Sequence, residues 1–525
     1  MPTKSQAINA ERLKSLAFAG VNSLKDYPAE LALIQAVARG EDARIGSIPP
    51  QFMQIARADE RVKRLGREHE VRAEMIRWLC VDPIASALVD PLGIRMYGAL
   101  ISGALNLSHL QIRFPIVMNY CRISEPANLD GLQILALDLQ GSWTGPLTIQ
   151  WARIQQALFL DRGFRAEGGV RLYGSHVGSL ECEGGTFINA NKWAIYADSL
   201  TVDGMVLLRA HSKSEPFLAR GSVRLLGASI GGDVDCQGAT FINPGGIALG
   251  LARATVKGAL LLRGGREEDK HDGRVVVGGF KAEGVIDLRG TSAGILDDDV
   301  LGWPNAGDLK LDGFVYARFN PASPSDPQSR LSWLSRDRTL NIVQPYQQLA
   351  KLLKDSGNTR GAKEVLSQME SRLSKANDPP AVQLLRASIG YGYQPENAVW
   401  GLLGLTAVGA LLSWRSQRMG NIVLLAEDSS NDGAASQGFK PHEHRSNPII
   451  FSLENTFPLV KLGEADKWGP TSQEAASGKG NLASRISSRM VSGRFMRWFI
   501  WIQILLGWLL ATLFVAGVLG IVQKS

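Results

Sequence analysis

The tightest cluster of metal-binding residue types in the sequence is His442-Glu443-His444. In an extended segment, an H-x-H pattern offers two imidazole nitrogens to a metal ion, whereas a structural zinc site needs four ligands. Two ligands do not make a closed site. We therefore interpret this segment as a solvated loop and predict no metal site there.

A second candidate is the acidic run Asp297-Asp298-Asp299, with Asp308 and Asp312 nearby. Calcium is bound by carboxylate and carbonyl oxygens, which these residues could supply. Their spacing, however, is not that of a known calcium-binding loop. We interpret the run as a polar turn.

The four cysteines are widely spaced and form no C-x-x-C pair. The sequence therefore lacks the motif of a zinc ribbon or of a thioredoxin-type redox site. Free cysteine commonly behaves as a small buried apolar residue. We expect that role for Cys80, Cys121, Cys182 and Cys236.

The glycine-rich and catalytic motifs of common enzymes are absent from the sequence. We find no phosphate-binding G-x-x-x-x-G-K-[ST], no G-x-S-x-G, no H-E-x-x-H and no dinucleotide fingerprint. The nearest glycine cluster, residues 227–232, lies inside a repeat. We accordingly assign no catalytic, cofactor-binding or metal-binding residue and favour a protein that is not an enzyme.

The net charge of +7 does not predict nucleic-acid binding, because the excess is not on the main folded region. Residues 93–320 hold 22 Lys and Arg against 23 Asp and Glu, while residues 415–497 hold 11 against 8. Basic residues beside an apolar segment are typical of membrane flanks. A basic stretch near the N-terminus alternates with acidic residues, which indicates an ion-paired helix face. Its basic members are Arg57, Arg61, Lys63, Arg64, Arg67, Arg72 and Arg77.

Residues 1–92 carry helical signals and are interpreted as a helical N-terminal domain or cap. In ELALIQAVAR and EHEVRAEMIRWLC, apolar residues recur at three and four positions, as in an amphipathic helix. The first residues contain no uninterrupted apolar core of signal-peptide length, so we expect no secretory signal.

Residues 93–319 change to short alternating apolar pairs separated by glycine, which is typical of short strands and turns. The stretch starting at Gly169 aligns with that at Ser222, so that Cys182 matches Cys236. Phe164-x-Ala166, Phe217-x-Ala219 and Phe280-x-Ala282 mark three passages of the unit. Such self-similarity predicts a mainly β fold, a right-handed pentapeptide-like β-solenoid, with Cys182 and Cys236 in its interior. The alternative is a β-sandwich, which gives no reason for a repeat.

Residues 320–395 are interpreted as a linker and a helical hairpin. The linker is NPASPSDP, and the segment PYQQLAKLLKDSGNTRGAKEVLSQMESRL predicts two helices joined at Gly357-Asn358. The pair resembles half of a tetratricopeptide unit, and three repeats would be needed for an independent array. We expect it to cover one end of the solenoid.

Two apolar segments predict membrane helices. Residues 498–522 hold no charge over 25 positions, enough to cross a bilayer of about 30 Å. Residues 396–414 form a shorter candidate, and residues 415–497 between them are expected to be a polar, partly disordered loop. Arginines beside both segments place this loop in the cytoplasm by the positive-inside rule, which would export the solenoid. Because no export signal is evident, we expect the solenoid to be cytoplasmic. One arrangement that satisfies both signals makes residues 398–414 re-entrant.

The order of these parts resembles a family of bacterial membrane proteins of unknown function with pentapeptide-like solenoid repeats and C-terminal transmembrane helices. The matching stretches are Gly98 to Leu107, Gly227 to Val234, GYGYQPENAVW, NPIIFSLENTFPLVKLGEADKWGPT and LLGWLLATLFVAGVLG. Members are often labelled membrane-associated oxidoreductases. The resemblance implies a location at the bacterial inner membrane.

Three functions follow as expectations. The first is a non-enzymatic scaffold, sensor or binding protein, anchored in the lipid bilayer and presenting its solenoid to another protein, with homo-oligomers possible and no nucleic acid involved. The second is an oligomeric pore or transport component, in which residues 451–463 dip into the bilayer and Glu454 and Lys461 affect conductance. The third, an oxidoreductase, follows from the family label alone.

Overall fold

The computed structural model describes residues 4–20, 26–45, 66–269, 273–339, 342–373, 396–418, 422–424, 446–457, 460–470 and 493–519. The chain divides into two compact units, Met1–Gly357 and Asn358–Ser525, called unit 1 and unit 2 below. This division falls inside the segment interpreted as one helical hairpin. The domain boundaries inferred from the sequence stay predictions.

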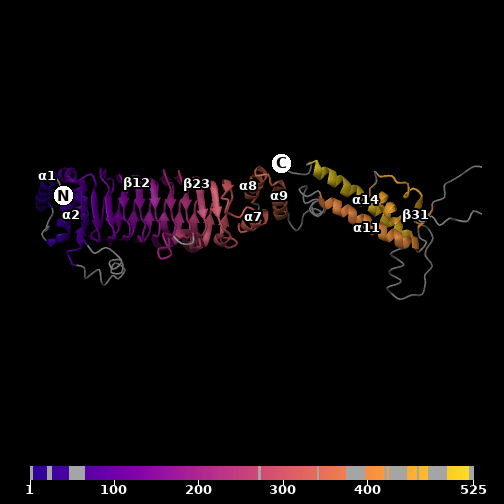
Figure 1. The fold of residues 1–525 in the computed structure, drawn as a ribbon, viewed down its shortest axis with the longest axis horizontal. Coiled ribbons are helices and arrows are strands. Elements are labelled where there is room, and N and C mark those ends of the chain that lie inside the picture. Colours follow the sequence, from indigo (N-terminus) through magenta and orange to yellow (C-terminus); the bar gives the residue numbers. More distant parts are fainter. Residues whose placement is uncertain are drawn as a thin grey trace, which may run out of the picture. The chain divides into compact units, whose positions relative to one another are not determined.

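Unit 1 is built on two large sheets whose strands all pair in parallel. The chain alternates between the sheets, and neighbouring strands lie side by side in chain order (Figure 1). The 14-stranded sheet contains β1 (Ala43–Arg44), β3 (Ile94–Tyr97), β5 (Ile116–Asn119), β8 (Gln133–Ile134), β9 (Leu137–Asp138), β12 (Arg153–Phe159), β15 (His176–Glu181), β17 (Thr201–Val202), β18 (Val206–Leu207), β20 (Ser229–Ile230), β21 (Val234–Asp235), β23 (Thr255–Leu262), β27 (Ser292–Asp298) and β29 (Val315–Phe319).

The second sheet has 13 strands. They are β2 (Glu70–Arg72), β4 (Leu100–Ser102), β6 (Arg122–Ile123), β7 (Ala127–Asn128), β10 (Trp143–Thr144), β11 (Leu147–Thr148), β13 (Arg165–Glu167), β14 (Val170–Arg171), β16 (Thr186–Tyr196), β19 (Leu218–Arg224), β22 (Thr240–Gly250), β26 (Lys281–Asp287) and β28 (Leu309–Lys310). The strands β24 (Gly265–Asp269) and β25 (Gly273–Gly278) form a separate antiparallel pair.

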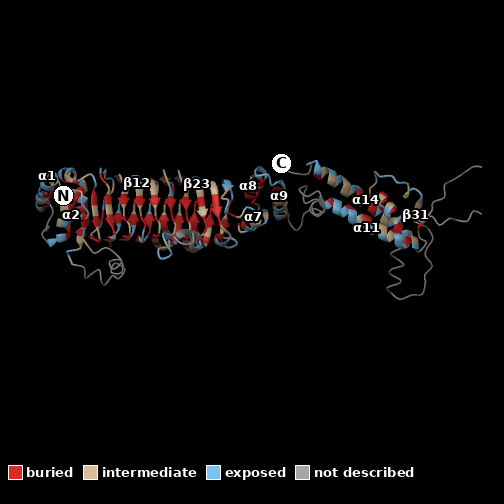
Figure 2. Cartoon of the chain, in the orientation of Figure 1, coloured by how far each residue is buried: buried red, intermediate tan, exposed pale blue. Residues whose placement is uncertain are grey.

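Identical register from strand to strand aligns apolar side chains into buried columns. One column in the 14-stranded sheet comprises Leu137, Leu158, Leu180, Val206, Val234, Leu260 and Leu296, all fully buried. Figure 2 shows buried residues running through the strands along unit 1. Burying such side chains contributes roughly 1.5–3 kcal/mol each, which makes these columns the main source of stability.

The repeat detected in the sequence supplies two strands to the 13-stranded sheet, not one. Ala166 pairs with Phe187, which pairs with Ala219, and Phe241 follows in the same row. The phenylalanine rings form a continuous ladder, with centroids 5.4 to 5.8 Å apart, of Phe164, Phe187, Phe217, Phe241 and Phe280. The expected equivalence of the Phe-x-Ala pairs is thus confirmed, with a second Phe between each pair of them.

Helices lie at the two ends of these sheets in unit 1. They are α1 (Lys4–Gly20), α2 (Pro28–Arg39), α5 (Ala73–Val81) and α6 (Pro83–Leu88) at the first end, and η2 (Val300–Gly302), α7 (Pro327–Leu334) and α8 (Gln344–Asp355) at the second (Figure 1). At the first end, the fully buried Glu30 of α2 accepts hydrogen bonds from the Arg72 backbone N–H (2.9 Å) and guanidinium (2.7 and 2.9 Å).

A second buried ion pair joins the other end of the sheets to α7. The Arg330 guanidinium donates to both oxygens of Asp298 at 2.7 and 2.8 Å, and its Nε donates to the Pro324 carbonyl at 2.6 Å. The ring of Phe319 covers the guanidinium at 3.8 Å. Since Asp298 closes β27 and Phe319 closes β29, α7 is attached to the last strands of the stack.

Unit 2 contains α9 (Thr359–Leu373), α11 (Glu396–Arg418), α12 (Pro448–Thr456), α14 (Gly493–Val518) and the antiparallel strands β30 (Ile422–Leu424) and β31 (Trp468–Pro470). Helices α8 and α9 agree with the two helices expected around Gly357. Helix α12 and the strand pair lie within the segment expected to be a loop, so that expectation is incomplete.

Two helices of unit 2 are long and apolar enough to cross a membrane. Over Asn397–Arg418 the mean hydropathy is 1.4, and over Arg494–Val518 it is 2.2. Much of the surface of α11 and α14 is exposed (Figure 2). Exposed apolar surface of this kind is what a membrane helix presents to lipid. These helices support an association with a membrane.

We predict that Arg330→Met lowers the free energy of unfolding of unit 1 by about 3–5 kcal/mol, because it leaves Asp298 buried without its charge partner. Chemical unfolding of the detergent-solubilised full chain, followed by the far-ultraviolet signal of the strands, measures the loss. Lys281→Met is the control, since its ion pair with Glu283 is exposed and contributes less than about 1 kcal/mol. Equal losses of stability in the two variants would contradict the role of Arg330 in attaching α7 to the last strands of the sheets.

Candidate functional site

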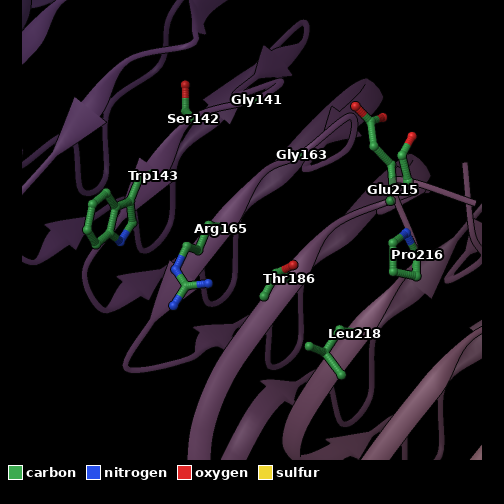
Figure 3. Close-up of a pocket in the computed structure, with 11 residues that line it drawn as sticks. Gly141, Ser142, Trp143, Gly163, Arg165, Thr186, Glu215, Pro216 and Leu218 are labelled. Atoms are coloured by element: carbon green, nitrogen blue, oxygen red, sulfur yellow. The ribbon is translucent and has the colours of Figure 1, made fainter. Parts of the chain in front are cut away.

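A groove with a volume of about 170 Å³ lies along the 13-stranded sheet of unit 1 (Figure 3). One wall is a column of side chains from successive strands, Trp143, Arg165, Thr186 and Leu218, aligned by the parallel register. The opposite wall is the segment Ser214–Pro216, and glycines form the floor. We call this site the groove.

Local sequence explains why the groove is open. Gly141 adopts a positive φ of 64°, and its lack of a side chain leaves room for the Tyr120 ring, which a β-carbon there would meet. On the opposite wall, the segment is held by a tight turn. The His211 N–H donates to the Glu215 carbonyl at 3.0 Å, and the Glu215 N–H donates to Ser212 Oγ at 3.2 Å.

The polar groups of the groove are mostly paired, which favours binding over catalysis. Nε and Nη2 of Arg165 donate to one Glu167 oxygen at 2.9 and 2.7 Å, and Arg122 stacks on the Trp143 ring at 3.8 Å. The Ser142 hydroxyl is buried, donates to the Met118 carbonyl at 2.6 Å and accepts the Cys121 N–H at 2.8 Å. It is therefore not free to act as a nucleophile. The groove thus offers two apolar side chains, Trp143 and Leu218, with the polar Arg165 and Thr186 between them.

Four exposed or half-buried aromatic residues lie along the same sheet, but they stack on one another. Tyr196 stacks against Tyr173 at 5.7 Å and Trp193 at 4.5 Å, and Trp151 meets the Tyr173 ring edge-on at 4.8 Å. The faces of these aromatic rings are thus covered by one another. Trp151, which is 63% exposed, offers the largest free apolar surface of the four.

A ladder of buried polar side chains follows the corner beside the groove. Asn119 donates to Asp138 at 3.2 Å, and Gln140 donates to Asp161 at 3.4 Å. Asp161 is only 5% exposed, and its Oδ1 has no hydrogen-bond partner. Burial raises the pKa of the Asp161 carboxyl from 3.8 to about 6 and also raises the pKa of Asp138. Further along, Arg209 bridges Glu183 at 3.1 Å and Asp235 at 3.0 Å, which neutralises the ladder there.

The interpretation of residues 297–299 as a polar turn is wrong. Asp297 pairs with Arg263 at 2.8 Å, Asp298 pairs with Arg330, and Asp299 caps η2 by accepting the Gly302 N–H at 2.7 Å. All three lie at the end of the sheets that α7 covers. There, arginines balance the charges of Asp297 and Asp298, as a metal ion could otherwise do. Among the residues that the structure describes, no group of three or more His, Cys, Asp and Glu side chains could hold a metal ion.

The expected burial of the cysteines is confirmed for Cys121, Cys182 and Cys236, while Cys80 is half-buried. All four are free thiols. Burial raises the pKa of Cys80 and Cys121 to about 12 and also raises those of Cys182 and Cys236 well above the usual value. The thiols therefore stay protonated and unreactive at neutral pH.

Other expected features fall partly outside the described residues. His442-Glu443-His444 and the basic residues from Arg57 to Arg64 lie outside them. The expected helix face is wrong for Arg67 and Arg72, which lie in a turn and in β2 and pair with Asp26 and Glu30 from a distant part of the chain. Arg77 of α5 donates to the Asn106 carbonyl at 2.5 Å.

We predict that Asp161→Asn stabilises unit 1 at pH 7.5 and that its advantage shrinks towards pH 4.5. Because the folded chain holds this proton up to about pH 6, whereas an unfolded aspartate releases it near pH ~3.9, stability falls as pH rises through this window and stays lower above it. Thermal midpoints of the full chain at both pH values measure the effect. The exposed control Asp355→Asn should match the parent at each pH, and a constant gap between Asp161→Asn and the parent would contradict the account.

Comparison with known proteins gives no neighbour: no family model, no curated protein and no solved structure matches this chain.

Proposed function

We propose that this protein is a non-enzymatic scaffold or binding protein that is anchored in a membrane by unit 2 and presents unit 1 to a partner. The observation that carries the proposal is the union in one chain of a long, end-covered stack of parallel strands with two helices long enough to cross a bilayer. The groove is the surface offered to the partner, an extended segment of another protein.

The two sheets support a finer description as a right-handed, pentapeptide-like β-solenoid. The alternation of strands between two parallel sheets, the aligned apolar columns and the phenylalanine ladder are what stacked coils require. The family suggested by the sequence is part of the same proposal. Under this proposal, unit 1 is a rigid platform for binding. Its function depends on its length and not on a reactive centre.

The proposed location is the bacterial inner membrane with unit 1 in the cytoplasm. The arginines beside α11 and α14 oppose this orientation, and protease accessibility of unit 1 from each side of the membrane tests it. The partner is a protein and not a nucleic acid, because residues 93–320 carry almost balanced charge. A homo-oligomer is compatible with the same surface.

A photocrosslinking experiment in cells tests the scaffold function. A photoreactive amino acid is placed at Thr186 in the groove, or at the exposed Arg153 on the other sheet as a control. We expect a discrete adduct from position 186 and none from position 153. An adduct of twice the chain mass would identify a second copy as the occupant. If neither Thr186 nor Leu218 gives an adduct, the groove is not the partner site.

A pore or transport component is the second candidate, favoured by the short helix α12, which hydrogen-bonds to both α11 and α14. Under this alternative, the full chain reconstituted in planar bilayers conducts ions, and Glu454→Gln or Lys461→Gln changes the conductance. If the chain is shown to be inserted and the bilayers conduct no ions, the pore alternative is excluded. The oxidoreductase alternative stays a hypothesis from the family label, and flavin, haem or metal bound to the purified protein would support it.

A further inference from the structure

Helix α12 packs between the two apolar helices of unit 2 through polar side chains. Ser452 Oγ donates to the Thr406 carbonyl of α11 at 2.7 Å. Gln503 of α14, which is 1% exposed, donates to Ser452 Oγ at 2.8 Å, to the Ser452 carbonyl at 3.0 Å and to Thr456 Oγ1 at 2.7 Å. One buried amide thus joins α14 to the end of α12.

Glycines permit this close packing. A side chain at Gly507 of α14 would collide with the Thr456 backbone, and one at Gly409 of α11 would collide with Ser452. By contrast, Gly404 of α11 has open space around its α-carbon. Small residues at helix contacts are typical of membrane helix packing, because they let backbones approach.

The contacts place the end of α12 deep along the two helices. At about 1.5 Å per residue, Gly507 lies about 15 Å along α14 from Arg497. This is half of a hydrocarbon core of ~30 Å. The start of α12 lies at the arginine-bearing end, since Ser446 bonds to Gln417 of α11 and Phe451 packs with Ile422 and Met496. Strand β31 returns the chain to that same end.

The return of the chain beyond α12 depends on one carboxylate. Glu454, which is 8% exposed, accepts four consecutive backbone N–H groups. One of its oxygens accepts those of Leu462 and Gly463, each at 2.9 Å, and the other accepts those of Glu464 and Ala465 at 2.9 and 2.8 Å. These N–H groups are not in a helix or strand, so Glu454 supplies the acceptor that secondary structure does not provide.

We propose that residues 446–457 and 460–470 are the two arms of a re-entrant hairpin that enters and leaves the bilayer at the arginine-bearing end of α11 and α14. Glu454 is the positioning residue that holds the second arm against the first near mid-membrane. Hydrocarbon provides no hydrogen-bond acceptor, so non-helical backbone at that depth must be satisfied by protein groups. The carboxylate satisfies four of them at once. A charged side chain in a membrane is otherwise costly and points to a specific role.

This inference rests on α11 and α14 crossing a bilayer, not on the scaffold function. It is tested by the depth of a fluorescent probe on Leu462→Cys, whose position is 53% exposed, in the full chain reconstituted in vesicles. A probe on Ile449→Cys, at the start of α12 and 63% exposed, is the shallow reference. The native thiols are silent because burial raises their pKa values, Cys80 and Cys121 to about 12.

Lipids carrying a quencher either near the headgroup or deep in the acyl chain report the depth. We expect the deep quencher to act more strongly at position 462 and the shallow one at position 449. Water-like emission at both positions would show that unit 2 does not insert at all. Shallow quenching at 462 with α14 inserted, as reported by its own tryptophans, would overturn the re-entrant hairpin alone.

Substitution of Glu454 then tests its positioning role. In Glu454→Gln, the new NH2 group faces backbone N–H donors, so we expect the probe at position 462 to move towards the headgroups. Glu454→Asp retains two acceptor oxygens and should restore part of the depth. An unchanged depth in Glu454→Gln would overturn the role of the carboxylate.

A glycine pair supplies a second test that does not change charge. Gly507→Ala should displace α12 and make the probe at position 462 shallower. Gly404→Ala should have no effect, since the space there is open. Equal depth in both variants would contradict the packing of α12 against α14.

Discussion

Parallel strand stacking is the constraint on which unit 1 depends. Most of its strands pair on both sides with strands from other parts of the chain, so the register of one pair constrains that of the next. The same constraint leaves terminal strands with unpaired backbone groups at both ends of the sheets, and exposed strand edges invite aggregation. The protein covers both ends with helices and locks each cover by a buried ion pair, Glu30 with Arg72 and Asp298 with Arg330.

The buried columns of unit 1 could be predicted in part from the sequence, because its self-similar segments place similar residues at matching positions. The Phe-x-Ala pairs and the matching of Cys182 with Cys236 predicted buried columns, and the structure places these residues in them. The same alignment matches Phe187 with Phe241, each within the sequence TFIN. What the sequence did not indicate is that these two rings alternate with Phe164, Phe217 and Phe280 in one ladder.

The ends and the membrane unit were predicted less well for a physical reason: their partners are remote in the chain. Nothing in Asp297-Asp298-Asp299 itself indicates that Arg263 and Arg330 will neutralise it. The groove likewise requires the register of four strands. The sequence suggested that residues 451–463 dip into the bilayer, but it gave no sign of the bonds that join helix α12 to Thr406 and Gln503.

The two units solve the same problem of buried polar groups in different ways. Unit 1 pairs carboxylates with arginines at its ends and along the corner ladder. Asp161 keeps a raised pKa, because its burial outweighs the long contact with Arg162 at 4.0 Å. Unit 2 uses an amide and a carboxylate to satisfy backbone groups instead. This difference fits a protein in which unit 1 meets water and a partner, while unit 2 meets lipid.

The most direct measurement of the central claim is protease accessibility of unit 1 in intact spheroplasts and in inverted membrane vesicles, with an epitope tag at each end of the chain. The account predicts that unit 1 stays with the membranes and is cut only in inverted vesicles, as expected of a cytoplasmic scaffold held by unit 2. Cleavage in intact spheroplasts, or recovery of the uncut chain away from the membranes, would contradict it.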